Sequence, residues 1–252
     1  MYFGIYLQFS NGNKYNGEDQ FRDILKKITG QVVPVIIVEN NHQNKNLDER
    51  AILGNNSERE FSGYQTGLEY LKSEFNLDEN TVLFFANDTF NVNYAGDQYL
   101  ELFLLPEVIS NIHKGNFVGY VDRLAEDVSL LGRKGNQWIR TSFFSISYGY
   151  LNRILPFGKG FASDHLFSNK DKEFFSDSNE ISENYKEFLR SWLFGEKNKF
   201  PSEVKWHSAK NLTKANFSGF KIKAQCIFSE FLLSQDALLS DVKFVDVRNI
   251  KL

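Results

Sequence analysis

Strand-like and helix-like segments alternate in the N-terminal third of the chain, and this alternation limits the possible folds more than any other feature. Residues 2–9 are strand-like. The next apolar residues recur at the spacing of one helix face: Phe21, Ile24, Leu25 and Ile28. Gly30 is placed to end that helix, and the run "VVPVIIVENN" that follows is typical of a strand buried on both faces. The order predicts a β-α-β unit.

A second helix and a third strand continue the pattern. In "NNSEREFSGYQTGLEYLKSEF" the apolar residues lie on one helical stripe, and Ser57 with Glu60 forms a capping-box sequence that predicts where this helix begins. "TVLFFAND" is then typical of a strand. Strands that alternate with helices of this length predict an α/β fold with a mostly parallel sheet, in which ligands bind beyond the carboxyl ends of the strands.

The second half of the chain is less regular. We expect strands at residues 117–121 and 137–151, and an edge strand in "VKFVDV". Two further helices are indicated by two apolar sets: Ile181, Tyr185, Phe188 and Trp192, and Ile227, Phe228, Phe231 and Leu232. No change of composition marks a linker, so we predict one domain over residues 1–252.

Composition excludes several classes of protein. The net charge of −3 and the pI of about 5.9 show no basic excess, so we expect no nucleic-acid partner. Cys226 is the only cysteine, which excludes an intramolecular disulfide and a multi-cysteine zinc site and is typical of the cytoplasm. The N-terminal segment "MYFGIYLQFSNGN" resembles neither a signal peptide nor a membrane span.

Three common catalytic or nucleotide-binding motifs are missing from the sequence. There is no G-x-x-x-x-G-K-[ST] loop, no G-x-S-x-G turn and no G-x-G-x-x-G after the first strand. A P-loop NTPase, a serine hydrolase of the nucleophile-elbow type and the usual dinucleotide enzymes are therefore not indicated.

Polar residues end two of the predicted buried strands. Glu39 and Asn40 follow one of them, and Asp88 follows another. A carboxylate in such a place is costly unless it is solvated, hydrogen-bonded or bound to a cation, so Asp88 either faces a ligand cleft or belongs to an Asx-type turn with Asn87 and Thr89. Aromatic residues make up 15% of the chain, and we expect them to fill the core rather than to line a cleft.

The order of these features resembles the GT-A class of glycosyltransferases, and within it the family-2-like bacterial enzymes that build surface polysaccharides. The resemblance rests on "VIIVENN", "GNNSEREFSGYQTGL", "LFFANDTF" and "WIRTSFF", and it spans about residues 1–150. It implies a GT-A-like sheet flanked by helices, with a nucleotide-binding half at 1–115 and a more irregular acceptor-binding half at 116–252.

The resemblance also implies roles for individual residues. Nucleotide-sugar contacts are expected from Glu39, Asn40, Asn56, Asn87 and Arg140. Asp88 takes the place of the last acid of a DxD-type motif, whose first acid is replaced here by Ala86, and would hold Mn²⁺ or Mg²⁺ with His207 as a second ligand. A surface or packed position is the alternative for His207.

A catalytic base is expected among the acids before the helix at 181–192. Glu183 is the first candidate and Asp177 the second, although acids are also favoured near a helix N-terminus without any catalytic role. Arg140, between aromatic residues, would suit a sugar or diphosphate pocket, with a surface ion pair as the alternative.

These features together predict a glycosyltransferase that moves a sugar from a nucleotide-diphosphate sugar to a glycan or lipid-linked acceptor, with inversion at the sugar. We expect a cytoplasmic protein, with peripheral attachment to the inner face of the membrane compatible with its aromatic content. Two alternatives stay open: a non-catalytic sugar-binding subunit of a polysaccharide assembly complex, and a sugar-phosphate nucleotidyltransferase that would use "QFSNGNKYNG" as its phosphate loop.

Overall fold

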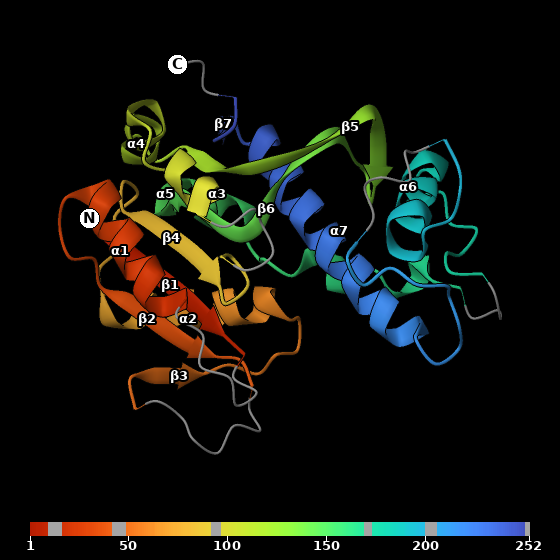
Figure 1. Ribbon diagram of the computed structural model, residues 1–252, viewed down its shortest axis with the longest axis horizontal. Coiled ribbons are helices and arrows are strands. Elements are labelled where there is room, and N and C mark those ends of the chain that lie inside the picture. The colour runs from red at the N-terminus through yellow and green to blue at the C-terminus, as the bar shows by residue number, and fades with distance from the viewer. Residues whose placement is uncertain (10–16, 42–48, 92–96, 169–172, 200–205, 250–252) are drawn as a thin grey trace. The chain divides into compact units, whose positions relative to one another are not determined.

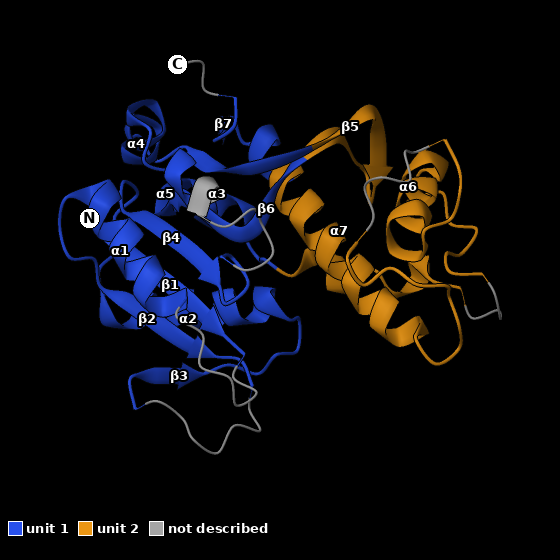
Figure 2. Ribbon diagram, viewed as in Figure 1, with its two compact units in different colours: residues 1–122, 138–157, 236–252 blue, residues 123–137, 158–235 orange. Residues whose placement is uncertain are grey.

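The computed structural model describes residues 1–9, 17–41, 49–91, 97–168, 173–199 and 206–249, and the chain divides into two compact units (Figures 1 and 2). Unit 1 comprises residues 1–122, 138–157 and 236–252, and unit 2 comprises residues 123–137 and 158–235. The chain therefore passes between the units several times.

Among the described residues, unit 1 is built on a seven-stranded sheet with the order β3-β2-β1-β4-β6-β5-β7. The strands are β1 (Tyr2–Gln8), β2 (Val35–Glu39), β3 (Ala51–Leu53), β4 (Val82–Asn87), β5 (Phe117–Leu130), β6 (Arg133–Ser147) and β7 (Phe244–Asp246). β1 is parallel to both β2 and β4, β3 is parallel to β2, and β7 is parallel to β5, whereas β6 runs antiparallel to β4. The prediction of an α/β fold with a mostly parallel sheet flanked by helices is confirmed.

Helices cover both faces of this sheet. Unit 1 contains α1 (Gly17–Thr29), α2 (Glu60–Glu74), α3 (Asp97–Leu102), α4 (Pro106–His113) and α5 (Tyr148–Ile154). The predicted apolar stripe of α1 is buried in a cluster with Phe84 and Phe143. α2 lies against the other face, so closely that a Cβ on Gly67 would come within 2.6 Å of the Ile5 side chain. Only glycine permits this approach of helix to strand.

The aromatic residues fill the core of unit 1, as predicted. Phe85 and Phe144 stack with a centroid distance of 4.7 Å across the β4–β6 pair, and Tyr64 meets Phe85 edge to face at 5.3 Å. The Tyr64 hydroxyl donates a hydrogen bond of 2.6 Å to the Thr141 carbonyl, which satisfies the one polar group of this buried ring. A layer of packed aromatic rings therefore fills the space between α2 and the sheet.

Unit 2 contains the distal part of the β5–β6 hairpin and a group of helices. These helices are η1 (Lys159–Ala162), η2 (Asp164–Leu166), α6 (Glu183–Phe194) and α7 (Phe217–Leu239). The last residues of α7, from Asp236 onward, belong to unit 1. Tyr185 of α6 packs against Phe228 and Phe231 of α7. Cys226 is buried on α7, as expected of an inert thiol.

Some local predictions were wrong or incomplete. Ser57 does not cap α2, because the helix begins only at Glu60 and its N-cap position is Arg59. The backbone N–H and hydroxyl of Ser57 donate to Asn55 Oδ1 instead. β3, α3 and α4 were not expected, and the strand expected at 137–151 ends at Ser147, where α5 begins. In the part of the chain that the structure describes, no helix has the length and apolarity needed to cross a membrane.

Candidate functional site

The carboxyl ends of β2, β1 and β4 meet at one edge of the sheet, and their arrows point the same way in Figure 1. Gln8 of β1 is level with Glu39 on one side, and Leu7 is level with Asn87 on the other. The chain goes from β1 to β2 on one side and returns later to β4 on the opposite side. The strand order therefore reverses between β1 and β4. Ligands of open α/β sheets bind at such a reversal point, beyond the carboxyl ends of the strands.

Asp88 lies at this reversal point. Its Oδ2 accepts a hydrogen bond of 2.8 Å from the backbone N–H of Phe9, directly after β1. Burial raises the pKa of Asp88, and the nearby Glu39 and Glu60 carboxylates raise it further, against the opposing effect of the bond from Phe9. The surroundings therefore disfavour negative charge on Asp88, and a cation bound there would relieve that cost.

Glu39 is a second carboxylate at the same edge, and it is fully buried at 0% exposure. Its Oε1 accepts a hydrogen bond of 2.8 Å from the Asn41 backbone N–H, and its Oε2 accepts one of 3.4 Å from Gln8 Nε2. These bonds offset part of the cost of burying a carboxylate. They also hold the Glu39 side chain beside the end of β1.

Tyr6 brings a hydroxyl to the start of α1. A Cβ on Gly17 would overlap the Tyr6 hydroxyl, which shows how closely the ring approaches the helix. Burial raises the pKa of Tyr6, and the carboxylates of Asp88 and Glu18 raise it further. Tyr6 is therefore neutral at ordinary pH and keeps its proton as a hydrogen-bond donor.

Asn40 and Asn56 form a clamp that holds the loop before α2. Asn40 Nδ2 donates to Asn56 Oδ1 at 3.1 Å and to the Arg59 carbonyl at 2.8 Å, while Asn40 Oδ1 accepts from the Asn56 backbone N–H at 3.1 Å. Asn56 and Arg59 both have positive φ, of 51° and 55°, which is unfavourable for residues other than glycine. The clamp holds this strained loop at the carboxyl edge of the sheet.

Replacing Asn40 with alanine is expected to lower the free energy of unfolding by about 2 kcal/mol, because the variant leaves the polar groups of a strained loop without partners. Urea denaturation measures the effect. Asn55→Ala is the matched control, since Asn55 is exposed and, among the described residues, binds only the neighbouring Ser57; it should cost about 0.5 kcal/mol. Equal losses in the two variants would contradict the clamp.

Asn87 forms the local turn that the sequence offered as an alternative. Its Oδ1 accepts hydrogen bonds from the backbone N–H of Thr89 at 3.1 Å and from the Thr89 hydroxyl at 2.8 Å. Asp88, in contrast, bonds across to the end of β1. The turn and the strand-end carboxylate therefore coexist, and the turn fixes the direction in which the chain leaves β4.

Arg140 is engaged by Asp122 on the neighbouring strand. Its Nε and Nη2 each donate to one Asp122 oxygen at 2.7 Å, and the guanidinium lies 4.1 Å from the centre of the Tyr120 ring. This is the ion pair that the sequence left open as the alternative to a diphosphate contact. The nucleotide-sugar role of Arg140 stays a prediction.

The other three candidate residues belong to unit 2. Glu183 starts α6 with a side chain that is 76% exposed, and its Oε1 accepts a hydrogen bond of 2.6 Å from the buried Lys186 ammonium. Asp177 is exposed in the segment before α6, and His207 is exposed with its ring against Trp206. In the described part of the chain, no three His, Cys, Asp or Glu side chains are grouped to hold a metal ion. The catalytic and metal-binding roles of these residues stay predictions.

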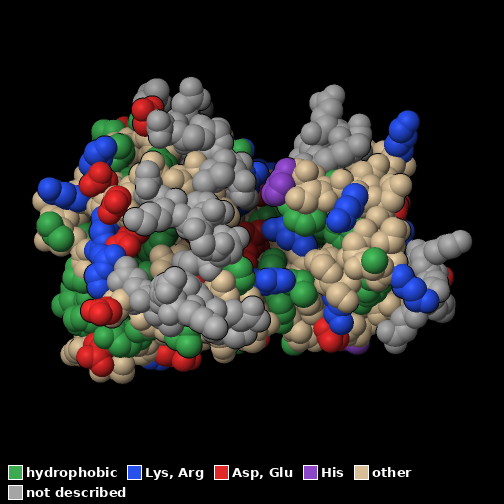
Figure 3. Space-filling model, turned by 60° about the horizontal axis from the view of Figure 1, so that its bottom comes forward, with side chains coloured by type: hydrophobic (Ala, Val, Ile, Leu, Met, Phe, Trp, Pro, Cys, Tyr) green, Lys and Arg blue, Asp and Glu red, His purple; other side chains and the backbone are tan. Residues whose placement is uncertain are grey.

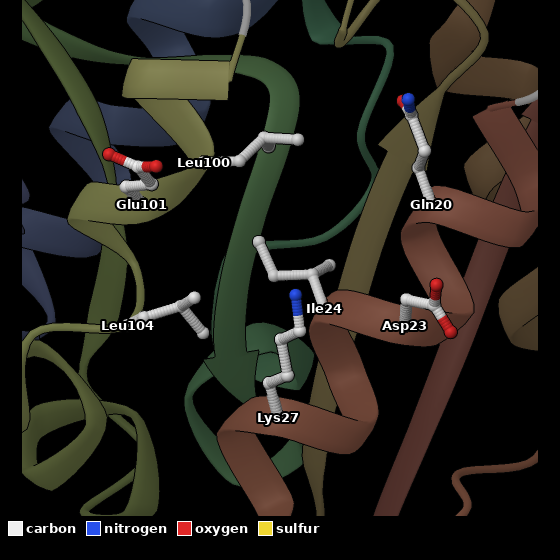
Figure 4. Close-up of a pocket in the computed structure, with 7 residues that line it drawn as sticks. All are labelled: Gln20, Asp23, Ile24, Lys27, Leu100, Glu101 and Leu104. Carbon is white, nitrogen blue, oxygen red and sulfur yellow. The ribbon is translucent and has the colours of Figure 1, made fainter.

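A cavity of about 270 Å³ lies beside α1 in unit 1 and contains none of the predicted residues. Figure 4 shows Ile24 and Lys27 of α1 on one side of it and Leu100 and Leu104 on the other. Gln20, Asp23 and Glu101 complete its lining. Its walls combine apolar side chains with one ammonium group.

Sequence analysis missed Tyr6 and the Phe9 backbone N–H as parts of the carboxyl edge. A signal was present, because the end of the first strand must lie beside the ends of both parallel neighbours in a β-α-β arrangement. Acids and amides were the residue types considered for the strand ends, and Tyr6 lies within an apolar run, so it was not predicted. It also passed over Arg59, whose unusual backbone conformation only the structure shows.

Comparison with known proteins assigns no family. No protein-family model and no curated protein sequence matches this chain. Among solved structures, it is similar to 2-C-methyl-D-erythritol 4-phosphate cytidylyltransferase of Francisella tularensis, at 10% sequence identity and a TM-score of 0.29, over 64% of this chain and 79% of that chain. A likeness at this level does not assign an activity.

Proposed function

We propose that the protein is a glycosyltransferase that binds a nucleotide-diphosphate sugar at the carboxyl edge of the unit 1 sheet. The observation that carries the proposal is the placement of Asp88 at the reversal point between β1 and β4, bonded to the end of β1 and close to Glu39. The resemblance of "VIIVENN" and "LFFANDTF" to glycosyltransferase motifs supports it. Glu39 and the Asn40–Asn56 loop would lie beside the nucleoside.

Mg²⁺ or Mn²⁺ is the cofactor that we propose for this site. Such ions bind through one or two carboxylates and complete their shell with waters and substrate phosphate oxygens. Asp88 would hold the ion, and the burial and neighbouring carboxylates that raise its pKa are the conditions under which a cation is most stabilising. The metal would neutralise the charge that develops on the departing diphosphate. His207 is the proposed further ligand, and Glu183, followed by Asp177, the proposed base.

Calorimetry of the full chain with uridine and guanosine diphosphates, with and without Mn²⁺, tests the proposal. We expect one nucleotide to bind, and to bind more tightly with Mn²⁺ because the ion joins Asp88 to the diphosphate. Asp23→Asn is the control for the loss of a carboxylate charge, because Asp23 lies at an exposed position of α1. This variant should bind the nucleotide as tightly as the unchanged protein does. Binding of neither nucleotide under any of these conditions would overturn the proposal.

A non-catalytic sugar-binding role is the second candidate, and Ala86 favours it. This residue occupies the first acidic position of the expected motif and is fully buried in the core of unit 1. Release of a nucleoside diphosphate from a nucleotide sugar in the presence of an acceptor distinguishes the enzyme from the binding protein. Release of pyrophosphate from a nucleoside triphosphate and a sugar phosphate would instead indicate a nucleotidyltransferase. The loop predicted for that activity lies mostly outside the described residues.

A further inference from the structure

The segments after α6 in unit 2 are strongly basic. After α6, the described residues 195–199 and 206–223 contain six lysines and one acidic residue, Glu196. These lysines are Lys197, Lys199, Lys210, Lys214, Lys221 and Lys223. The whole chain carries a net charge of −3, so the charge of these segments is opposite in sign to the net charge of the protein. Figure 3 shows Lys and Arg side chains spread among uncharged side chains over the face of unit 2 that is turned to the viewer, on the right.

Two tryptophans lie among these lysines and hold each other in place. The Trp192 and Trp206 rings stack with a centroid distance of 6.0 Å and an angle of 20°, and the Trp206 backbone N–H donates to the Trp192 carbonyl at 3.0 Å. Lys223 Nζ lies 5.7 Å from one ring centre and 5.8 Å from the other. Both indoles are half-buried and fixed by these contacts. They form a fixed aromatic pair beside the Lys223 ammonium.

The positive charge around the tryptophans is only partly neutralised within the protein. Lys199 pairs with Glu126 at 3.1 Å, and Lys221 pairs with Asp164 at 3.0 Å. Lys197 and Lys210 are exposed and form no ion pair or hydrogen bond with any residue that the structure describes.

We propose that Trp192, Trp206, Lys197, Lys210 and Lys223, the basic-aromatic surface of unit 2, bind a glycan that carries negative charges. Lysine ammonium groups attract carboxylates or phosphates along the chain, and the indoles provide apolar faces on which sugar rings can rest. The inference rests on the proposed glycosyltransferase function, and within it the acceptor is an acidic glycan. Nothing in the proposed donor site requires this property of the acceptor.

The test measures binding of the full chain to three oligosaccharides of matched length. Oligogalacturonate carries carboxylates, an oligomer of glycerol phosphate linked to a sugar carries phosphates, and dextran oligosaccharide is neutral. We expect at least one anionic ligand to bind on the order of tenfold more tightly than dextran in low salt, and to lose this advantage as the salt concentration rises, because ions screen exposed charges. The comparison of the two anionic ligands identifies the charged group.

Charge-reversal variants locate the binding surface. The double variant Lys197→Glu/Lys210→Glu alters two exposed side chains without ion pairs to described residues, so it should fold normally and weaken anionic-glycan binding on the order of tenfold. Lys72→Glu on the exposed side of α2 is the control for a change of net charge and should leave glycan binding unchanged. Lys223→Gln removes the cation beside both indoles and should weaken binding by a smaller factor.

Several results would overturn the inference. These are equal binding of dextran and the anionic ligands, normal binding by the double variant, and tighter binding to single-stranded DNA or to phosphatidylglycerol vesicles than to either anionic glycan. A nucleotide titration on the same samples separates the two proposals. A protein that binds nucleotide but prefers no anionic glycan refutes only the basic-aromatic surface. One that binds the anionic glycan but no nucleotide refutes only the proposed donor site.

Discussion

Asp88→Asn is expected to reduce glycosyl transfer by at least about a hundredfold and, at the same time, to raise the thermal stability of the protein at neutral pH. The loss follows because the amide cannot hold the cation and diphosphate as a carboxylate does. The gain follows because the folded protein disfavours the charged form of Asp88, through burial and through Glu39 and Glu60. Turnover with a nucleotide sugar and thermal unfolding on the same samples measure both effects.

The pH dependence of stability gives a second check on Asp88. Its pKa is higher in the folded protein than in the unfolded chain, so the folded state binds the proton more tightly. The charged carboxylate therefore costs stability above the folded pKa, and the cost disappears as the pH falls below the unfolded value of 3.8. The advantage of Asp88→Asn in melting temperature should accordingly shrink as the pH is lowered from about 7 to about 4. An advantage that grows on acidification would contradict this account of Asp88.

Arg248→Ala is expected to lower the free energy of unfolding by about 3 kcal/mol, the largest loss of stability that we predict. The Arg248 guanidinium binds both oxygens of Asp246, a residue of β7 whose side chain is only 2% exposed. It also donates to the Tyr120 hydroxyl at 2.8 Å and lies 3.7 Å from the centre of that ring on β5. The truncation leaves a buried carboxylate short of its cation and removes the link between the two strands. Chemical denaturation measures the loss.

A double-mutant cycle separates the ion pair from the other contacts of Arg248. Asp246→Asn removes the charge and keeps one oxygen, which can still accept the bond from the Arg248 backbone N–H. If the pair carries the effect, the double variant Arg248→Ala/Asp246→Asn should be less destabilised than the sum of the single variants. Arg248→Lys retains the charge without the planar fork and should be intermediate. Strict additivity would assign the effect to the Tyr120 contacts instead.

The sequence predicted those parts of unit 1 that depend on local patterns. Alternating apolar segments indicated β1, α1, β2, α2 and β4, and the parallel arrangement that follows from them placed Glu39 and Asp88 at one edge of the sheet. β3 escaped prediction because it has only three residues, none of them buried, so it shows no apolar run. Short elements at a sheet edge leave little trace in hydrophobic periodicity.

Side-chain partners were harder to predict than elements, because they depend on residues far apart in the sequence. The Arg140–Asp122 pair depends on which residues of two strands face each other, and the bond from Phe9 to Asp88 depends on the register of β1 and β4. Ser57 had the expected neighbours for a helix cap, yet it bonds to Asn55 and the helix begins three residues later, at Glu60. Competition among nearby polar groups of this kind is decided by geometry rather than by residue type.

The alternation of the chain between the two units has a consequence for how the protein is made on the ribosome. Phe117 of β5 pairs in parallel with Phe244 of β7, and the residues between them include all of unit 2. The edge of β5 that pairs with β7 therefore stays unpaired until unit 2 has been synthesised. During that interval the unpaired edge can associate with other nascent chains. A nonsense mutation between residues 236 and 243 would remove β7 and make this exposure permanent, so such truncated chains should aggregate rather than accumulate as a folded sheet.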